Sequence, residues 1–476
     1  MNDITAFFAF LRYSLGKKED MSRVIAGMDW QELYSFASKQ ALLGLCFEGI
    51  ERLGKEYPEE LRLNPIGREL LMTWMGKAQQ IRRQNMKVNT VASKLFSMLR
   101  EDGLRCCVLK GQGNALMYSN PYSRTPGDID VWIDASRERI MEYAQKKFEL
   151  EDDIRLQHLE TSLDGVPVEL HFFPCSMNNP IYHTRLQKWF RRNADLQCSH
   201  IVGLPDGAGD IAIPTTAFNV VYQLTHLYHH FFDEGIGMRQ IIDYFLVVND
   251  FSKNVFLNND LSNHPVNFSN HPVPLSKEGS TFSPSPSSSG SGDVTAPSRC
   301  SEPLRSKDGG PSKVSPDCAG WDRLGAIRAS KPSPNCVGWD RLAIEEDNSA
   351  GSTTAVTSSA STALDVVQKD LKYLGLWKFA GAVMYVLHET LGLSDEKMIA
   401  PMDEKRGKLL LAEILNGGNF GKHFTKYGHF TQQGMAKKYF LKIWRNMHFV
   451  RYYPAEALSE PIFRTWHFFW RLKYRR

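Results

Sequence analysis

Two aspartates, one residue apart, are the side chains in this sequence best placed to do chemistry. Asp128 and Asp130 stand in the run Gly-Asp-Ile-Asp-Val-Trp-Ile at residues 127–133. In an extended strand, alternate side chains point to opposite faces, so both carboxylates share one face and Ile129, Val131 and Ile133 share the other. Their backbones are then about 7 Å apart, and the two carboxylates can converge on one hard cation. The pattern predicts a metal site.

A third acid comes from a predicted hairpin. Residues 155–163 and 166–173 have the composition of strands, and Asp164-Gly165 between them is a strong turn signal. Glu169 and His171 share one face of the second strand, and we interpret His171 as a strand histidine hydrogen-bonded beside Glu169. Three carboxylates suit a pair of Mg²⁺ ions about 4 Å apart, with Mn²⁺ as a substitute. Such a pair activates an attacking hydroxyl and steadies a triphosphate.

The acid pair also has a purely structural interpretation. Asp128 would then be a turn residue after Gly127, and Asp130 a solvated strand residue. Acids are disfavoured in strands, so two of them among Ile and Val residues weigh against this interpretation.

A glycine-containing turn upstream of the acids could approach a phosphate. Residues 104–109 are predicted as a short buried strand, followed by the turn Lys110-Gly111-Gln112-Gly113 and a helix from Asn114 to Tyr118. Glycines let the backbone come close to a phosphate, and a helix N-terminus favours negative charge. Lys110 and Arg124 could supply positive charge to phosphates during transfer. Most such turns only connect elements, so this prediction depends on the acids downstream.

Together these residues resemble the uncharacterised nucleotidyltransferase family of bacteria, within the DNA polymerase beta-like superfamily. The resemblance rests on Leu109-Lys110-Gly111, Arg124, Gly127-Asp128-Ile129-Asp130 and Val168-Glu169-Leu170-His171. The later His229 or His230, with Arg239 and Asp243, is similar to the helical region that follows the catalytic domain in that family. The match covers most of the chain outside residues 250–362.

The resemblance implies an α+β fold with the acids on a mixed sheet. It also implies transfer of a nucleoside monophosphate from an NTP, by default ATP, to an unidentified acceptor hydroxyl or phosphate, with release of pyrophosphate. Asp128, Asp130 and Glu169 would be the catalytic metal ligands, and Glu169 would help to activate the acceptor. The implied nucleotide-binding residues are Lys110, Gly111, Arg124 and Gly127. The superfamily's turn is usually Gly-Gly or Gly-Ser, so the Lys-Gly turn here lacks a serine hydroxyl and allows a weakened enzyme.

The rest of the sequence divides into flanking regions. Residues 1–103 are predicted to be helical, residues 104–200 to form the small mixed-sheet nucleotidyltransferase domain, and residues 201–249 with 363–476 a second helical region. Residues 189–214 are predicted to be a loop-rich connection. Residues 250–362 are rich in Ser, Pro, Gly and Asn and are predicted to be a disordered insertion. The insertion repeats Gly-Trp-Asp-Arg-Leu at 320–324 and 338–342, so the alternative is a docking peptide presented twice.

Bulk composition constrains the protein less than its motifs do. The chain has 476 residues, a net charge of +4 and no apolar run long enough for a membrane span. We expect no signal peptide, and the eight cysteines form no CxxC pair, which favours a reduced cytoplasmic protein without a zinc site. Residues 449–476 interleave aromatic and basic residues. A terminal helix packing its aromatics inward is favoured there, with nucleic-acid or membrane-surface contact as the alternatives.

Two other functions fit the sequence. Asp128-Ile129-Asp130 could be the Asp-x-Asp of a sugar-nucleotide glycosyltransferase, although a helical segment rather than several βαβ units precedes it. A catalytically degenerate nucleotide-binding or scaffold protein is the third possibility. Binding of NTPs, of a UDP-sugar or of neither would discriminate among the three.

Overall fold

The computed structural model describes residues 4–150, 155–261, 363–422 and 435–474. The predicted insertion, including both Gly-Trp-Asp-Arg-Leu copies, lies outside the described residues from position 262 onward. The insertion was predicted to begin at residue 250, but residues 250–261 belong to the helix Met238–Leu261. Among the residues described, no helix is both long enough and apolar enough to cross a membrane.

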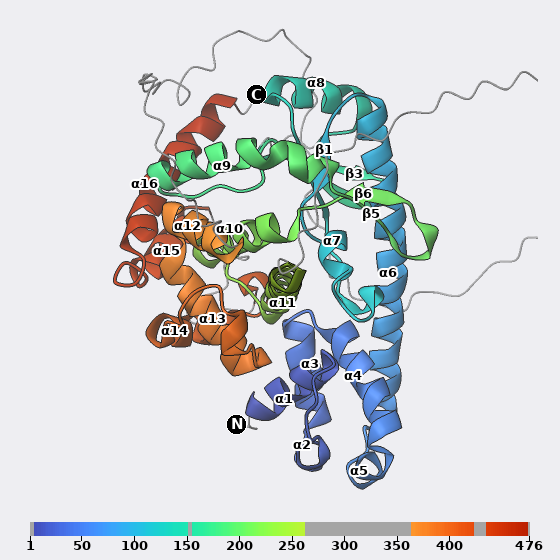
Figure 1. The fold of residues 1–476 in the computed structure, drawn as a ribbon. Helices are drawn as coiled ribbons and strands as arrows, with labels where there is room; N and C mark the ends of the chain where they lie inside the picture. The colour runs from blue at the N-terminus through green and yellow to red at the C-terminus, as the bar shows by residue number, and fades with distance from the viewer. Residues whose placement is uncertain (1–3, 151–154, 262–362, 423–434, 475–476) are drawn as a thin grey trace, which may run out of the picture. The chain divides into compact units, whose positions relative to one another are not determined.

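Six helices form the region before the sheet, as the sequence predicts. They are α1 (Ile4–Ser14), α2 (Ser22–Ala26), α3 (Trp30–Lys39), α4 (Leu43–Glu56), α5 (Pro58–Leu63) and α6 (Arg68–Glu101). Asp29 begins α3 because its side chain accepts hydrogen bonds from two otherwise unpaired backbone N–H groups. The helix α6 runs past the strands of the sheet (Figure 1).

A four-stranded mixed sheet carries the predicted acids. Its strands are β1 (Cys106–Val108), β2 (Ile129–Ile133), β3 (His158–Leu163) and β4 (Val166–His171), in the order β1-β2-β4-β3. Strands β2 and β4 are parallel, and the other two pairs are antiparallel. The Asp164-Gly165 turn closes the predicted hairpin, with φ of 50° and 70° at the two residues. These positive angles explain the Asp-Gly pair, which tolerates them well.

Apolar faces of α6 and of the sheet meet in one core. Val88, Val91, Leu95 and Leu99 of α6 have helical spacing and are buried in the same cluster as the apolar residues of β2 and β4. The opposite face, which carries Asp130, is packed as well, because Trp132 on that face contacts Phe190 and Phe218 in a second hydrophobic cluster.

Short elements connect the strands. They are α7 (Gln112–Ala115), the 3₁₀ turn η1 (Pro121–Ser123) and α8 (Arg137–Lys147). Ser136 caps α8, since its side chain accepts a hydrogen bond from Arg139 N. The helix predicted from Asn114 to Tyr118 begins two residues earlier and is only four residues long.

The prediction of a loop-rich connection at residues 189–214 is wrong. The helix α9 (Pro180–Ser199) occupies its first part, and the two-stranded sheet of β5 (Ile201–Gly203) and β6 (Asp210–Ala212), joined through η2 (Pro205–Gly207), occupies most of the rest. Asn179 caps α9, and Pro180 takes its first position. Both are ordinary helix-start signals.

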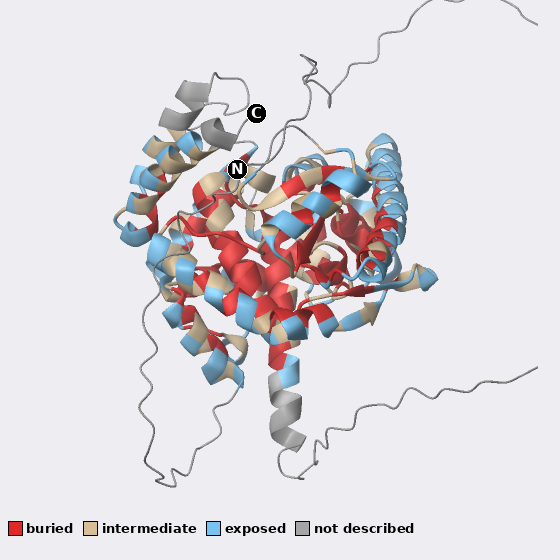
Figure 2. Ribbon diagram, turned by 90° about the horizontal axis from the view of Figure 1, so that it is seen from above, coloured by how far each residue is buried: buried red, intermediate tan, exposed pale blue. Residues whose placement is uncertain are grey.

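The remaining helices complete the second helical region. They are α10 (Thr216–Asp233), α11 (Met238–Leu261), α12 (Ala363–Tyr373), α13 (Trp377–Leu391), η3 (Asp395–Lys397), α14 (Glu404–Gly417), η4 (Asn419–Gly421), α15 (Met435–Met447) and α16 (Pro454–Tyr474). Buried residues concentrate toward the inside of this region and exposed residues on its outer faces (Figure 2). The predicted terminal helix is present, but it does not pack all its aromatics inward, because Phe468 and Phe469 are exposed.

Candidate functional site

The parallel pairing of β2 with β4 brings the three predicted carboxylates together. Asp130 is directly opposite Glu169 in the register of the two strands. Asp128, immediately before β2, completes a group whose ligand oxygens all lie within 4.8 Å of one another. Asp130 is buried, Glu169 is half-buried and Asp128 is exposed. Carboxylates at this spacing, with one side open, suit a divalent cation that also takes oxygens from a substrate.

His171 holds two of these carboxylates in place. Its Nε2 lies 3.1 Å from Asp130 Oδ1 and 3.1 Å from Glu169 Oε2, as expected for a histidine beside Glu169. Its other nitrogen, Nδ1, lies 3.3 Å from Gln157 Nε2. Burial lowers the pKa of His171, but the hydrogen bonds with the two carboxylates outweigh burial and raise the pKa to about 9.

Gln157 makes this orientation of His171 specific. The Gln157 amide nitrogen donates to Pro174 O at 3.1 Å, and its oxygen accepts from Ser176 Oγ at 3.3 Å. These contacts turn an N–H of the amide toward Nδ1 of His171, which presents a lone pair to it when the ring is neutral. The proton of the neutral ring is then on Nε2, and the charged ring carries one there too. In both states His171 donates to the carboxylates.

A second group with ligand-like spacing consists of His158, Glu169 and His171. His158 Nδ1 lies 3.4 Å from Glu169 Oε2, and neither of its ring nitrogens has a hydrogen-bond partner within the described ranges. Because Nε2 of His171 donates its proton to Asp130 and Glu169, it is not a free nitrogen ligand for a metal ion. The three carboxylates are therefore the better donor set.

Lys110 contacts the acids themselves. Its Nζ lies 3.1 Å from Asp130 Oδ1 and 2.9 Å from His226 Nε2. Burial lowers the pKa of Lys110, but the negative charges of Asp130, Asp128 and Glu169 outweigh burial, so the pKa is raised above its usual value. The ammonium group therefore balances part of the negative charge of the site. His226, a residue of α10, is held neutral because burial and the adjacent Lys110 lower its pKa well below its usual range.

Arg124, predicted to contact phosphates, is paired within the protein. Its Nε and Nη2 donate to the two oxygens of Asp243 on α11, at 2.9 Å and 2.8 Å. Only 4% of the Arg124 side chain and 5% of the Asp243 side chain are exposed, so the pair is shielded from water. Tyr118 also donates to Asp243 Oδ1 at 2.8 Å. The charge of Arg124 is thus neutralised by α11.

Gly111 leaves β1 in a backbone conformation that side chains avoid. Its φ of 58° and ψ of −105° lie outside the usual regions for other residues. A Cβ at this position would be 3.7 Å from Asp128 O. The turn therefore lies close to the acid strand, as predicted, although α7 is too short to present a full helix terminus.

A small cavity of about 40 Å³, open in part to solvent, lies over the acids. The predicted residues that line it are Lys110, Gly111, Arg124, Gly127, Asp128 and Asp130. Residues that the sequence did not assign to the site also line it, namely Gln223, His226, Leu227, Arg239, Gln240, Asp243 and Phe420. Apart from Phe420 these residues lie on α10 and α11, and their helical spacing alone predicts only packing.

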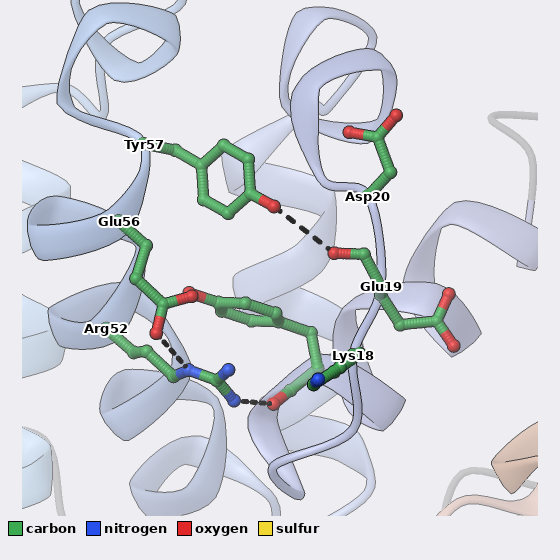
Figure 3. Close-up of a pocket in the computed structure, with 7 residues that line it drawn as sticks. Lys18, Glu19, Asp20, Arg52, Glu56 and Tyr57 are labelled. Carbon is green, nitrogen blue, oxygen red and sulfur yellow. Dashed lines mark hydrogen bonds and ion pairs between the residues drawn. The ribbon is translucent and has the colours of Figure 1, made fainter.

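A second surface pocket lies among the N-terminal helices, away from the acids (Figure 3). Its polar groups satisfy one another. Arg52 donates to Glu56 and to Tyr13 O, and Tyr57 donates to Glu19 O at 3.3 Å. This pocket has the contacts of a structural hydrogen-bond network and none of the carboxylate convergence seen at β2 and β4.

Comparison with known protein families gives a match to the part of the chain that contains the sheet. Residues 26–262 match a protein family described as uncharacterised nucleotidyltransferase. Through these residues the chain belongs to that family. The matched segment contains the whole sheet, the three carboxylates and the helices α10 and α11. The resemblance proposed from the motifs and the α+β fold with a mixed sheet are both confirmed.

Other similarities are weak. No curated protein matches the chain. One solved structure, an antigenic nucleotidyltransferase-like protein from Paracoccidioides brasiliensis, is similar at 17% identity with a TM-score of 0.24. That match covers 37% of this chain and 90% of the other. A similarity of that size carries no argument about this member of the uncharacterised nucleotidyltransferase family.

Proposed function

We propose that this protein is a Mg²⁺-dependent nucleotidyltransferase that moves a nucleoside monophosphate from an NTP to an acceptor hydroxyl or phosphate. The observation that supports the proposal is the convergence of Asp128, Asp130 and Glu169 at one edge of a cavity. In the reaction, the acceptor oxygen forms a bond to the α-phosphorus, and the bond from that phosphorus to the bridging oxygen breaks. Pyrophosphate leaves with the bridging oxygen.

The three carboxylates would hold the metal ions, Mg²⁺ by preference and Mn²⁺ as a substitute. When bound, such ions lower the pKa of an attacking hydroxyl and balance charge on the phosphates. Glu169, half-buried next to Asp130, is proposed to accept the acceptor's proton. His171 keeps Asp130 and Glu169 oriented toward each other. These tasks need no movement of the strands.

Lys110, Gly111 and Gly127 are proposed to border the nucleotide phosphates, with ATP as the default nucleotide. The left-handed turn at Gly111 lets the backbone approach the ligand without a side chain in between. We propose that Arg124 acts on the nucleotide indirectly, since its guanidinium is held by Asp243. The five cysteines in the described residues are all free and buried, which supports a reducing compartment such as the cytoplasm.

Calorimetric titration with each of the four NTPs, with and without Mg²⁺, tests the proposal. We expect at least one NTP to bind in a Mg²⁺-dependent manner and to release pyrophosphate slowly, with water as the acceptor. Asp128→Asn with Asp130→Asn should abolish pyrophosphate release, because charge-neutral amides bind Mg²⁺ weakly. Asp164→Asn, an exposed aspartate in the hairpin turn, is the matched control and should behave as the wild type.

Each other outcome has a definite meaning. Nucleotide binding without pyrophosphate release would favour the degenerate binding protein. Preference for a UDP-sugar would favour the Asp-x-Asp glycosyltransferase. Absence of binding by every NTP, or equal activity in the double variant, would contradict the proposal.

A further inference from the structure

Arg239 on α11 is a buried cation without a direct ion-pair partner among the described residues. Only 8% of the residue is exposed. Its Nη1 donates to Thr125 O at 3.1 Å, while its Nε is buried and has no hydrogen-bond partner among the described residues. Within the described ranges, no carboxylate oxygen lies within 4.0 Å of the Arg239 guanidinium as an ion-pair partner. A buried charge without a partner is costly, so its retention calls for an explanation.

The carboxylate on the same helix is already engaged by another cation. Asp243 lies one helical turn after Arg239, but both of its oxygens already accept from Arg124. Two guanidinium groups therefore share one carboxylate. Burial and the adjacent Arg124 lower the pKa of Arg239, while Asp243 and Asp128 act in the opposite direction. An anion bound in the cavity would supply the direct ion-pair partner that Arg239 lacks among the described residues.

Gln240, the next residue, adds an unpaired donor. Its side chain is 8% exposed, and its Oε1 accepts from the backbone N–H of Gly237 at 2.6 Å. That contact fixes which end of the amide is which, so the other end is the NH₂ group. This Nε2 is buried without a partner among the residues described. It can donate only to a further acceptor.

Both side chains line the cavity that Asp128 and Asp130 also line. Arg239 borders the acid strand closely, since a Cβ on Gly127 would lie 4.0 Å from its Nη1. The ring of Phe420 covers the guanidinium on another side, at 5.5 Å from ring centroid to Cζ. The unpaired donors therefore stand beside the proposed metal ligands and not in a separate pocket.

We propose that Arg239 and Gln240 bind a phosphate group of the substrate in this cavity. A guanidinium and an amide NH₂ supply several hydrogen-bond donors. The oxygens of a phosphate can accept more of these hydrogen bonds than the two oxygens of a single carboxylate. The Arg124–Asp243 pair then has a positioning role, because it ties α11 to the loop before β2 and so fixes where Arg239 lies. This assignment rests on the proposed function, and it moves the phosphate contact from Arg124 to Arg239.

The test compares ligands with and without phosphate. Full-length Arg239→Gln is titrated with Mg²⁺-ATP, with adenosine and with inorganic pyrophosphate, and Mn²⁺ binding is followed by electron paramagnetic resonance. Loss of a charge-assisted contact should weaken ATP and pyrophosphate binding about 10- to 100-fold. Binding of adenosine and of Mn²⁺ should change less than about threefold, because neither ligand meets Arg239 through a phosphate. Arg83→Gln, at an exposed arginine on α6, is the matched control.

Two further variants protect the result against a folding defect. Arg239→Lys keeps the positive charge but lacks the planar set of guanidinium N–H donors. Its affinity for ATP and pyrophosphate should lie between those of the wild type and Arg239→Gln. Gln240→Glu keeps the acceptor for Gly237 but replaces the Nε2 donor by an oxygen, so it should also weaken pyrophosphate binding. Unchanged ATP and pyrophosphate affinity in folded Arg239→Gln and in Gln240→Glu would overturn the inference.

The two proposals fail in different ways. If the wild type binds no NTP, the nucleotidyltransferase proposal fails. The phosphate site still stands if the wild type binds pyrophosphate and Arg239→Gln does not. If the wild type binds an NTP with the same affinity as Arg239→Gln, only the phosphate site is refuted.

Discussion

At the scale of single residues, the acid site depends on the groups that hold its carboxylates together. Asp130 and Glu169 lie side by side on parallel strands, so their charges repel each other. His171 donates to both, and Lys110 pairs with Asp130. Outer partners of this kind orient metal-binding carboxylates and affect metal affinity strongly.

We therefore predict that His171→Phe lowers the affinity for Mn²⁺ by about 10- to 100-fold while the protein remains folded. Titration with Mn²⁺ followed by electron paramagnetic resonance measures this. His158→Phe is the control: His158 also lies near Glu169, but it lacks a hydrogen-bond partner for either nitrogen among the described residues. Equal losses in the two variants would mean that His171 has no special positioning role.

At the scale of elements, the loop before β2 is fixed from two sides. Asn85 of α6 donates to Tyr122 O at 3.2 Å and to Arg124 O at 2.8 Å. Asp243 of α11 holds the side chain of Arg124. The loop that leads to the acids is thereby attached to one helix before the sheet and to one after it.

Removing one member of the buried pair should destabilise the fold. Arg124→Met leaves Asp243 buried without its cation, and we predict a loss of about 3–5 kcal/mol in the free energy of unfolding. Urea denaturation measures the loss. Adding Asp243→Leu removes the unpaired charge and should restore much of the stability. Arg105→Met, which breaks an exposed pair with Asp134, should cost less than about 1 kcal/mol; a similar loss in both single variants would contradict the argument.

At the scale of the whole molecule, every residue of the proposed site belongs to one compact unit. That unit comprises residues 1–266 and 359–476. Buried residues of α11, α12 and α13 share one hydrophobic cluster, so the unit has its own core on both sides of residues 267–358. The site therefore does not need those residues to be assembled.

Replacing residues 267–358 by a short Gly-Ser linker should leave ATP affinity within about twofold of the wild type, since a longer or shorter loop changes closure entropy only slightly. Calorimetric titration and far-ultraviolet circular dichroism measure binding and helicity. Retained helicity with lost ATP binding would show that the replaced segment contributes to the site.

Some predictions failed even though the local signals were present. Asn179-Pro180 marks the start of α9, and Leu186, Phe190, Ala194 and Cys198 recur at every fourth position as its buried stripe. Likewise, no glycine or proline stops α11 at Asn249, and the helix continues to Leu261. In both cases the prediction followed the composition of the segment and overlooked the local signals for where a helix begins or continues.

The sequence by itself determined what depends on neighbouring residues. The alternation that puts Asp128 and Asp130 on one face and the Asp164-Gly165 turn are local, and both appear as predicted. The family also followed from these motifs. Each depends on backbone geometry over a few residues, which the residue types constrain directly.

Only the tertiary structure decided which charges are available to a ligand. Arg124 and Asp243 are 119 positions apart in the sequence, and Lys110 and His226 are 116 apart. Whether a cation is neutralised depends on its distance through space from a carboxylate and on its shielding from water. No local pattern encodes either quantity. For this reason the acids could be identified from the sequence alone. The packing of α10 and α11 on the sheet was needed to distinguish Arg124, which forms an ion pair with Asp243, from Arg239, which has no ion-pair partner among the described residues.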